Sequence, residues 1–187
     1  MKRLLSATQL RRLRHHLQHG GIVAYPTESC YGLGCLPTHH HALRRLVRLK
    51  KRPQHKGMIV IGDNLTRLQT LLQPLSPITQ QQLNAIWPAR TTFLLPAQRR
   101  ISPLLRGKQR QQLAVRVPAH AAARDLCYLL QQPLVSTSCN RAGRRPCRNK
   151  REVQRQFGRA VWIIDGQIGN AKTPSQIIDW ASGKRLR

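Results

Sequence analysis

The stretch IVAYPTESCYGLG (residues 22–34) decides the fold, because an apolar run meets a polar, glycine-containing segment there. Residues 22–25 predict a short buried strand that Pro26 ends. Residues 26–34 predict a loop, in which Gly32 and Gly34 allow unusual backbone angles. Open α/β sheets place ligands just beyond strand ends, so this loop is a candidate binding segment, although a structural turn would use the same glycines. It is not a P-loop, because the closing Gly-Lys-Ser/Thr is absent.

Strands and helices alternate outward from this stretch. Ser6 and Gln9 match a capping box, and the helix that they begin ends at Gly20. Further strands are predicted at residues 58–61, 91–95, 113–117, 134–138 and 161–164, and further helices at residues 38–53, 65–72, 77–87, 119–131 and 149–157. No linker or repeat divides them. We therefore expect one α/β domain over residues 1–187, with a twisted open sheet of mixed strands and flanking helices. The pattern leaves the strand order open.

The composition limits the chemistry. The 187 residues hold 33 Lys and Arg but only 6 Asp and Glu, which disfavours paired-carboxylate hydrolysis and carboxylate metal cages. Cys35 precedes three histidines, but a second ligand pair at zinc spacing is missing, so no resident metal site is expected. The apolar runs are too short for a transmembrane helix. The five cysteines form no C-x-x-C pair, and the Arg-rich N-terminus reads as a helix better than as a transit peptide. A reducing cytoplasmic setting is expected.

The formal net charge of +27 attracts polyanions, which include nucleic acids, nucleotides and acidic membranes. A general bias of the proteome toward arginine would give the same charge. Aromatic residues make up only 4% of the chain, so base stacking is disfavoured. We expect attraction to phosphate without base readout.

Three polar groups beside predicted strands carry the candidate chemistry. Lys50, Arg52 and Lys56 precede one strand and suit phosphate or carboxylate binding, although a solvated charge run would look the same. Ser136, Ser138 and Asn140 follow another strand, and no His or Lys near them supports a nucleophilic serine. Arg116 lies within an apolar strand. It needs an anionic partner if it faces inward, whereas an edge strand would present it to solvent.

Together these motifs resemble the YrdC-like family of threonylcarbamoyl-adenylate synthases. The resemblance extends from about residue 4 to residue 178. It is carried, in the order of the family, by AYPTE (24–28) with YGLG (31–34), KKRP (50–53), AVRVP (114–118), STSCN (136–140) and TPSQIID (173–179). It implies a single YrdC-like catalytic domain over residues 1–187, whose sheet surrounds a basic concave cavity.

The resemblance also implies an activity. Family members are nucleotidyltransferases that make threonylcarbamoyl-AMP from L-threonine, bicarbonate and ATP, with Mg²⁺ on the ATP, and release pyrophosphate. The product supplies the t6A modification at position 37 of tRNAs that read ANN codons, through a separate threonylcarbamoyl transferase complex. The implied threonine residues are Thr27, Arg116, Ser136 and Ser175. The implied residues of the ATP and bicarbonate side are Lys50, Arg52, Lys56, Ser138 and Asn140. The implied catalytic residues are the same set without Lys56.

The chain departs from the family pattern at three places. Ala89-Arg90 stands where Gly-Pro often follows Trp-Pro, Ile61 stands where some members have a histidine, and Arg141 stands where a serine is common. Two alternatives stay open. One is a non-catalytic RNA-binding protein that uses the same basic face for tRNA, double-stranded RNA or ribosomal RNA. The other is a related carbamoyl-adenylate chemistry with a different acceptor.

Overall fold

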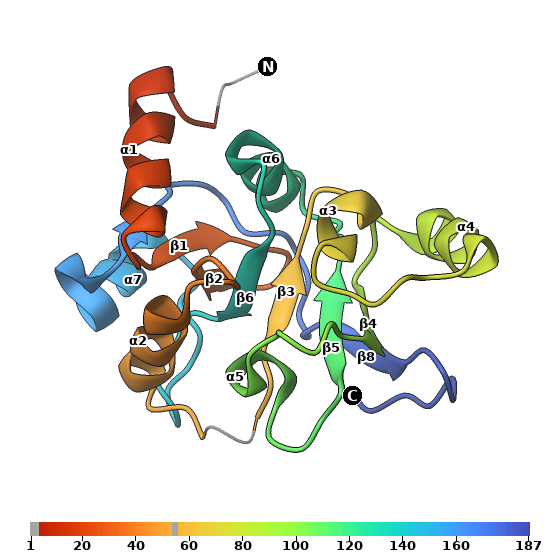
Figure 1. The fold of residues 1–187 in the computed structure, drawn as a ribbon. Coiled ribbons are helices and arrows are strands. Elements are labelled where there is room, and N and C mark those ends of the chain that lie inside the picture. The colour runs from red at the N-terminus through yellow and green to blue at the C-terminus, as the bar shows by residue number, and fades with distance from the viewer. Residues whose placement is uncertain (1–3, 54–55) are drawn as a thin grey trace.

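The structure is a computed structural model that describes residues 4–53 and 56–187, and a single mixed sheet runs through it (Figure 1). Its eight strands lie in the order β7-β1-β2-β6-β3-β5-β4-β8. The strands are β1 (Val23–Pro26), β2 (Tyr31–Gly34), β3 (Ile59–Ile61), β4 (Thr91–Pro96), β5 (Gln112–Arg116), β6 (Leu134–Ser138), β7 (Trp162–Ile163) and β8 (Gln176–Asp179). The predicted α/β class and the mixed sheet are confirmed.

Seven α-helices flank the sheet within the described ranges. They are α1 (Ala7–Gln18), α2 (His40–Lys50), α3 (Leu65–Gln69), α4 (Pro77–Ile86), α5 (Pro103–Arg106), α6 (Ala121–Leu130) and α7 (Lys150–Phe157). The capping box at Ser6 is confirmed, and Asn149 caps α7 as predicted. The second helix begins later than predicted, because the ring of His39, and not Thr38, accepts the backbone N–H of Ala42. No helix in these ranges combines the length and apolarity that a membrane crossing needs.

Strand β6 joins the two halves of the sheet. It pairs antiparallel with β2 on one side, where Gly32 lies opposite Ser138, and with β3 on the other, where Ile59 lies opposite Ser136. The parallel pairs are β1–β7, β3–β5 and β4–β8. The polar end of β6 therefore lies in the middle of the sheet.

The two faces of the sheet are covered unequally. On one face Val60, Val115 and Phe93 are buried in the larger of two apolar clusters. Their strand neighbours Ala114 and Leu94 point to the other face, because successive residues alternate, and both are only half-buried. Helices α1 and α6 cover this second face at its β1 end through the smaller cluster. We call the second face the open face.

The segment of residues 26–34 corrects the sequence prediction. It is not a loop throughout, because Tyr31–Gly34 forms β2 and returns as an antiparallel hairpin beside β1. The glycines have a packing role: an added Cβ at Gly32 would lie 3.4 Å from the ring of Tyr25, and one at Gly34 would lie 3.1 Å from it. The Tyr25 ring lies across this space and donates a hydrogen bond to the carbonyl of Val135 at 3.1 Å. The prediction of unusual backbone angles at these glycines is wrong.

Residues 164–175, which we call the crossing linker, connect the two edges of the sheet from β7 to β8 (drawn in blue in Figure 1). The linker bonds to the turn between β1 and β2 on its way. Gly169 N donates to the carbonyl of Thr27 at 2.9 Å, and Ala171 N donates to that of Glu28 at 3.0 Å. The linker therefore fixes the β1–β2 turn over the sheet.

We expect Gly34→Ala to destabilise the fold strongly, because the new Cβ would lie 2.2 Å from the backbone oxygen of Val135. Overpacking against rigid backbone costs about 3 kcal/mol of unfolding free energy, measurable by urea denaturation. Gly32→Ala is the matched control and should cost less, since the nearest atom to its Cβ is a side-chain methyl of Thr27 at 3.2 Å. Equal unfolding free energies for wild type and Gly34→Ala would contradict this account.

Candidate active site

The strand register brings the predicted residues of three strands to the open face. Ser136 and Ser138 share one face of β6. Arg116 on β5 lies opposite Ile61 of the neighbouring strand β3. Thr92 on β4 points the same way, and its hydroxyl lies 3.0 Å from that of Ser175. These side chains come from positions 92 to 175 of the chain. The sheet, and not local sequence, brings them together.

Lys50 shapes the turn after β6. It is 3% exposed, and its ammonium donates to the backbone oxygens of Ser138 and, at 2.8 Å, of Asn140. A third bond reaches Oδ1 of Asn140 at 3.4 Å, and the same Oδ1 accepts the hydroxyl of Ser138 at 2.6 Å. All three ammonium protons are thus used within the protein. Lys50 acts on the site by holding Ser138 and Asn140 in place.

The charge of Lys50 is weakened by its surroundings. Burial, and next the positive charge of Arg52, lower the pKa of Lys50 to about 8. A neutral amine would lose one of the three donors that hold the turn after β6.

Three arginines extend the positive charge from Lys50. Arg52 donates to the backbone oxygen of Gly57 at 2.8 Å, and burial followed by the charge of Arg187 lowers its pKa. Burial followed by the charge of Arg116 lowers the pKa of Arg187. Lys50, Arg52, Arg187 and Arg116 thus form a row in which each cation is close to the next. We call them the cation row; an anion bound along it would relieve their mutual repulsion.

Arg116 has an acidic partner that sequence reasoning did not foresee. Its guanidinium pairs with Glu28 at 3.1 Å, and the same carboxylate oxygen accepts the backbone N–H of Ala119 at 3.0 Å. Arg116 is 6% exposed on an interior strand, so the alternative of an edge arginine facing solvent is wrong. Its Nε is buried and has no hydrogen-bond partner among the described residues. One of the five N–H donors of this side chain is used among the described residues, and the others, the buried Nε included, are left for a ligand.

The remaining predicted hydroxyls each have a partner of their own. Ser136 lies beside the phenol of Tyr25, which is itself close to Arg116. Ser175 receives a hydrogen bond at 3.4 Å from Arg187, whose Nε also donates to the Ser175 carbonyl. Thr27 donates to the carbonyl of Cys30 at 2.7 Å, so in this structure its hydroxyl closes the β1–β2 turn.

Two residues of the site were missed by the sequence analysis. Arg187 has no local motif and reaches Ser175 only because residues 186 and 187 pair back onto Ile177. Thr92 follows a departure from the family pattern at Arg90, whose guanidinium donates to the carbonyl of Thr173 at 2.6 Å. The departure at residues 89–90 therefore adds a contact with the crossing linker.

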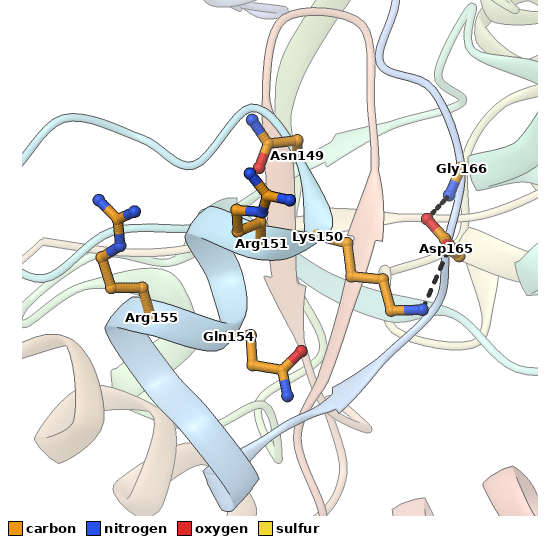
Figure 2. A pocket seen from close by; sticks show the side chains of 7 residues that line it. All are labelled: Asn149, Lys150, Arg151, Gln154, Arg155, Asp165 and Gly166. Carbon is orange, nitrogen blue, oxygen red and sulfur yellow. Dashed lines mark hydrogen bonds and ion pairs between the residues drawn. The ribbon is translucent and has the colours of Figure 1, made fainter.

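Other predicted features add no side-chain contact to the cation row. The Lys56 side chain is exposed, and Lys56 meets the row through its backbone oxygen, which accepts a hydrogen bond from Nε of Arg52 at 3.4 Å. Ile61, which replaces the family histidine, is a buried core residue. The hollow of about 710 Å³ beside α7, lined by Lys150, Arg151 and five other residues, includes no predicted site residue (Figure 2). The basic concave cavity stays a prediction.

Thiols near Lys50 are poor nucleophiles. Burial raises the pKa of Cys30 and, more strongly, that of Cys139, so both thiols stay protonated at neutral pH. Within residues 4–53 and 56–187, no group of three or more His, Cys, Asp or Glu side chains has a metal-binding arrangement. The described site offers cations and hydroxyl donors, which suit the positioning of negatively charged reactants.

The chain is similar to proteins of one family. Residues 15–187 match the Sua5/YciO/YrdC family model, whose description is "Telomere recombination". Threonylcarbamoyl-AMP synthase of Neisseria meningitidis serogroup A is 63% identical over 185 residues, which cover 99% of this chain and 98% of that protein. The protein of the same name from Laribacter hongkongensis is 51% identical over the whole of both chains, 187 residues of this one.

Solved structures share the fold. Pyrococcus abyssi Sua5 complexed with L-threonine superposes with a TM-score of 0.84 at 27% identity, covering 95% of this chain. This chain spans about half of that protein, 52% of its length. Escherichia coli YciO gives a TM-score of 0.77 at 24% identity and covers 93% of this chain and 84% of its own, which supports the fold alone.

The lowered pKa of Lys50 predicts a pH-dependent stability. Between about 8, its value in the fold, and its usual value of 10.5, the unfolded chain binds more protons at this residue, so its contribution to stability rises with pH. As pH rises across this range, the unfolding free energy of the wild type should increase by about 3 kcal/mol relative to that of Lys50→Met. Denaturant titrations at several pH values measure it. A difference that stays constant with pH would contradict the assignment.

Proposed function

The chain belongs to the Sua5/YciO/YrdC family, and from this premise we propose that it is a threonylcarbamoyl-AMP synthase, an enzyme that joins L-threonine, bicarbonate and ATP and releases pyrophosphate. The observation that carries the proposal is the cation row, which ends at a buried arginine whose Nε has no partner among the described residues. All three substrates carry a carboxylate, carbonate or phosphate group. The row provides complementary charge for them, and three of its four cations, Lys50, Arg52 and Arg116, lie in the family motifs.

Threonine is assigned to the Arg116 end of the row. Nε of Arg116 is an unpaired donor that a substrate carboxylate can accept from. Ser136, Ser175 and Thr92 add hydroxyls close by, which suit the amine and hydroxyl of the amino acid. The complex of P. abyssi Sua5 with L-threonine supports threonine as a substrate.

The nucleotide is assigned to the Lys50 end of the row. Arg52 and Arg187 provide guanidinium groups for the phosphates, and Ser138 and Asn140 provide the polar turn beside them. Lys50 is a positioning residue in this arrangement, because its protons already bind the turn. Lys56 lies on the exposed side of the Arg52 loop and is assigned to the triphosphate only through the family motif.

The chemistry needs little acid–base assistance from the protein. The neutral amine of threonine attacks the carbon of bicarbonate, and a carbamate forms with loss of water. A carbamate oxygen then attacks the α-phosphorus of ATP, the bond from this phosphorus to the bridging oxygen breaks, and pyrophosphate leaves. Positioning the anions and stabilising charge on phosphorus are the main tasks of the site. The cation row suits both tasks. The transfer of AMP from ATP to the carbamate is a nucleotidyltransferase reaction.

Magnesium enters as part of the substrate Mg-ATP. The side-chain carboxylate that pairs with the row is that of Glu28, and its ion pair with Arg116 and bond to Ala119 N occupy it. The phosphates and water would therefore supply most of the Mg²⁺ ligands. The product supplies the t6A modification at position 37 of ANN-reading tRNAs through a separate threonylcarbamoyl transferase complex.

We expect pyrophosphate release by the purified protein to require Mg-ATP, bicarbonate and L-threonine together, because the carbamate must form before it can attack phosphorus. Mass spectrometry of the products should show threonylcarbamoyl-AMP. Release without threonine or bicarbonate would overturn the proposal, and equal release with other amino acids would favour a different acceptor.

The double variant Arg52→Ala/Ser138→Ala separates the enzyme from the RNA-binding alternative. It removes one cation and one hydroxyl of the nucleotide end, so turnover should be lost while binding of a tRNA transcript stays within about threefold of wild type. Turnover and RNA binding, measured together, decide between the two functions. If the wild-type protein shows no turnover but binds RNA in a salt-sensitive way, it is the non-catalytic alternative.

Arg187→Gln should lower kcat/KM for ATP by about 100-fold, because a phosphate then loses a charge-assisted hydrogen bond. The KM for threonine should change less. Lys184→Gln is the matched control, since it removes the same charge from the same exposed segment. Equal effects of the two variants on ATP kinetics would remove Arg187 from the site.

A further inference from the structure

Tyr25 reaches from β1 across the sheet toward the residues assigned to threonine. Its ring passes over β2, where added Cβ atoms at Gly32 and Gly34 would lie 3.4 and 3.1 Å from it. Its hydroxyl donates to the backbone oxygen of Val135 on β6 at 3.1 Å. Tyr25 is only 1% exposed and lies outside the cation row. Any effect of this residue on a substrate must therefore pass through a neighbouring side chain.

The hydrogen-bonding direction of the Tyr25 phenol is fixed. A phenol has one proton and two lone pairs, and the bond to Val135 uses the proton. Burial raises the pKa of Tyr25 well above its usual value of 10, so the phenol keeps this proton at neutral pH. Toward any further neighbour, the Tyr25 oxygen is therefore an acceptor only.

Ser136 is this further neighbour. It follows Val135 on β6, and its side chain forms a hydrogen bond with the phenol that lowers the pKa of Tyr25, against the larger effect of burial. A hydrogen bond lowers the pKa of a phenol when it is donated to the oxygen, because it then stabilises the phenolate. The Ser136 hydroxyl therefore directs its single proton at Tyr25 and keeps the two lone pairs of Oγ for a ligand.

Ser136 and Arg116 thus offer opposite hydrogen-bonding groups. The charge of Arg116 also lowers the pKa of Tyr25, so both residues are near the same phenol. Nε of Arg116 is a buried donor without a partner among the described residues, whereas Oγ of Ser136 is an acceptor. An α-amino acid has the complementary groups on a single carbon, a carboxylate that accepts and an amine that donates. The two residues therefore fit an α-amino acid in one orientation.

We propose that Tyr25 is a positioning residue, which orients the hydroxyl of Ser136 so that it accepts a hydrogen bond from the amine of L-threonine. This inference rests on the proposed function and adds the orientation of the amino acid, with its carboxylate at Arg116 and its amine at Ser136. The neutral amine that attacks bicarbonate has two N–H groups and one lone pair. When one N–H donates to Ser136, the direction of the lone pair is restricted, which favours attack on the carbon.

The first test compares two buried tyrosines that differ in their contact with Ser136. Tyr25→Phe removes the phenol oxygen and keeps the ring. Tyr31→Phe is the matched control, because Tyr31 packs in the larger apolar cluster and donates its phenol proton to the backbone oxygen of Gly166 at 2.8 Å. Melting temperatures show whether both variants fold. The KM and kcat for threonine are measured by pyrophosphate release, and the Kd for threonine by titration calorimetry.

Tyr25→Phe should raise the KM and the Kd for threonine by about tenfold, because the freed proton of Ser136 then competes with the amine protons for the same space. The KM of Tyr25→Phe for ATP, and the KM of Tyr31→Phe for threonine, should stay within about twofold of wild type. Equal effects of the two variants on threonine would overturn the proposal.

A double-mutant cycle tests whether Tyr25 acts through Ser136. Ser136→Ala removes the acceptor, so adding Tyr25→Phe to it should not weaken threonine binding further. If the losses of affinity from the two single variants instead multiply in the double variant, Tyr25 acts independently of Ser136 and the proposal is wrong.

The assignment of the amine is tested with (R)-3-hydroxybutyrate, which is threonine without its amine. As a competitor of threonine, it should bind to wild type and to Tyr25→Phe with affinities that agree within about twofold. A loss of affinity equal to that of threonine would place the carboxylate or the hydroxyl at Ser136 and overturn the orientation.

The synthase activity and the role of Tyr25 fail in different ways. A wild type that releases no pyrophosphate but binds threonine, with an affinity that falls in Tyr25→Phe and not in Tyr31→Phe, would contradict the activity and support the role of Tyr25. A fully active wild type in which the two tyrosine variants behave alike would contradict the role of Tyr25 alone. A wild type that binds no threonine would contradict both.

Discussion

The buried ion pair between Arg116 and Glu28 is the interaction on which the rest of the site depends. It joins the β1–β2 turn to the interior strand β5, across 88 residues of sequence. Removing Glu28 would leave an unpaired guanidinium in the interior, at a cost of several kcal/mol. The pair is also incomplete, because Nε of Arg116 keeps an unused donor. The same contact thus stabilises the fold and prepares a fixed cation for a substrate anion.

The sequence predicted the elements well where one physical signal dominates. Strand β6 and helix α7 were correctly predicted, because an apolar run and an Asn–Glu cap are local features. The second strand was predicted as a loop because glycines usually mark turns. Here they leave room for the Tyr25 ring, which is a contact between neighbouring strands. Strand order depends on long-range pairing, such as that of β4 with β8, and no local pattern determines it.

The sequence predicted which residues form the site better than it predicted the contacts between them. The serines of β6 and the buried Arg116 lie on one face of the sheet, as the shared site requires. The support that Lys50 gives to the turn after β6 was not predicted, because sequence cannot show which oxygens accept its protons. Its contact with substrate stays a prediction. Arg187 joins the site through the backbone pairing of residues 177 and 187, a contact that only the folded chain shows.

The crossing linker is only slightly longer than the distance that it must span. Its ends are attached to β7 and β8, which are separated by seven strand spacings, or about 34 Å in a flat sheet. The 13 residue steps from Ile163 to Gln176 reach at most about 45 Å when fully extended, and the detour over Thr27 and Glu28 uses part of that reach. The linker thus acts as a tether that limits how far the sheet can flatten. Shortening it by a few residues would force the sheet to curl more tightly or pull β8 away from β4, and with it Ser175.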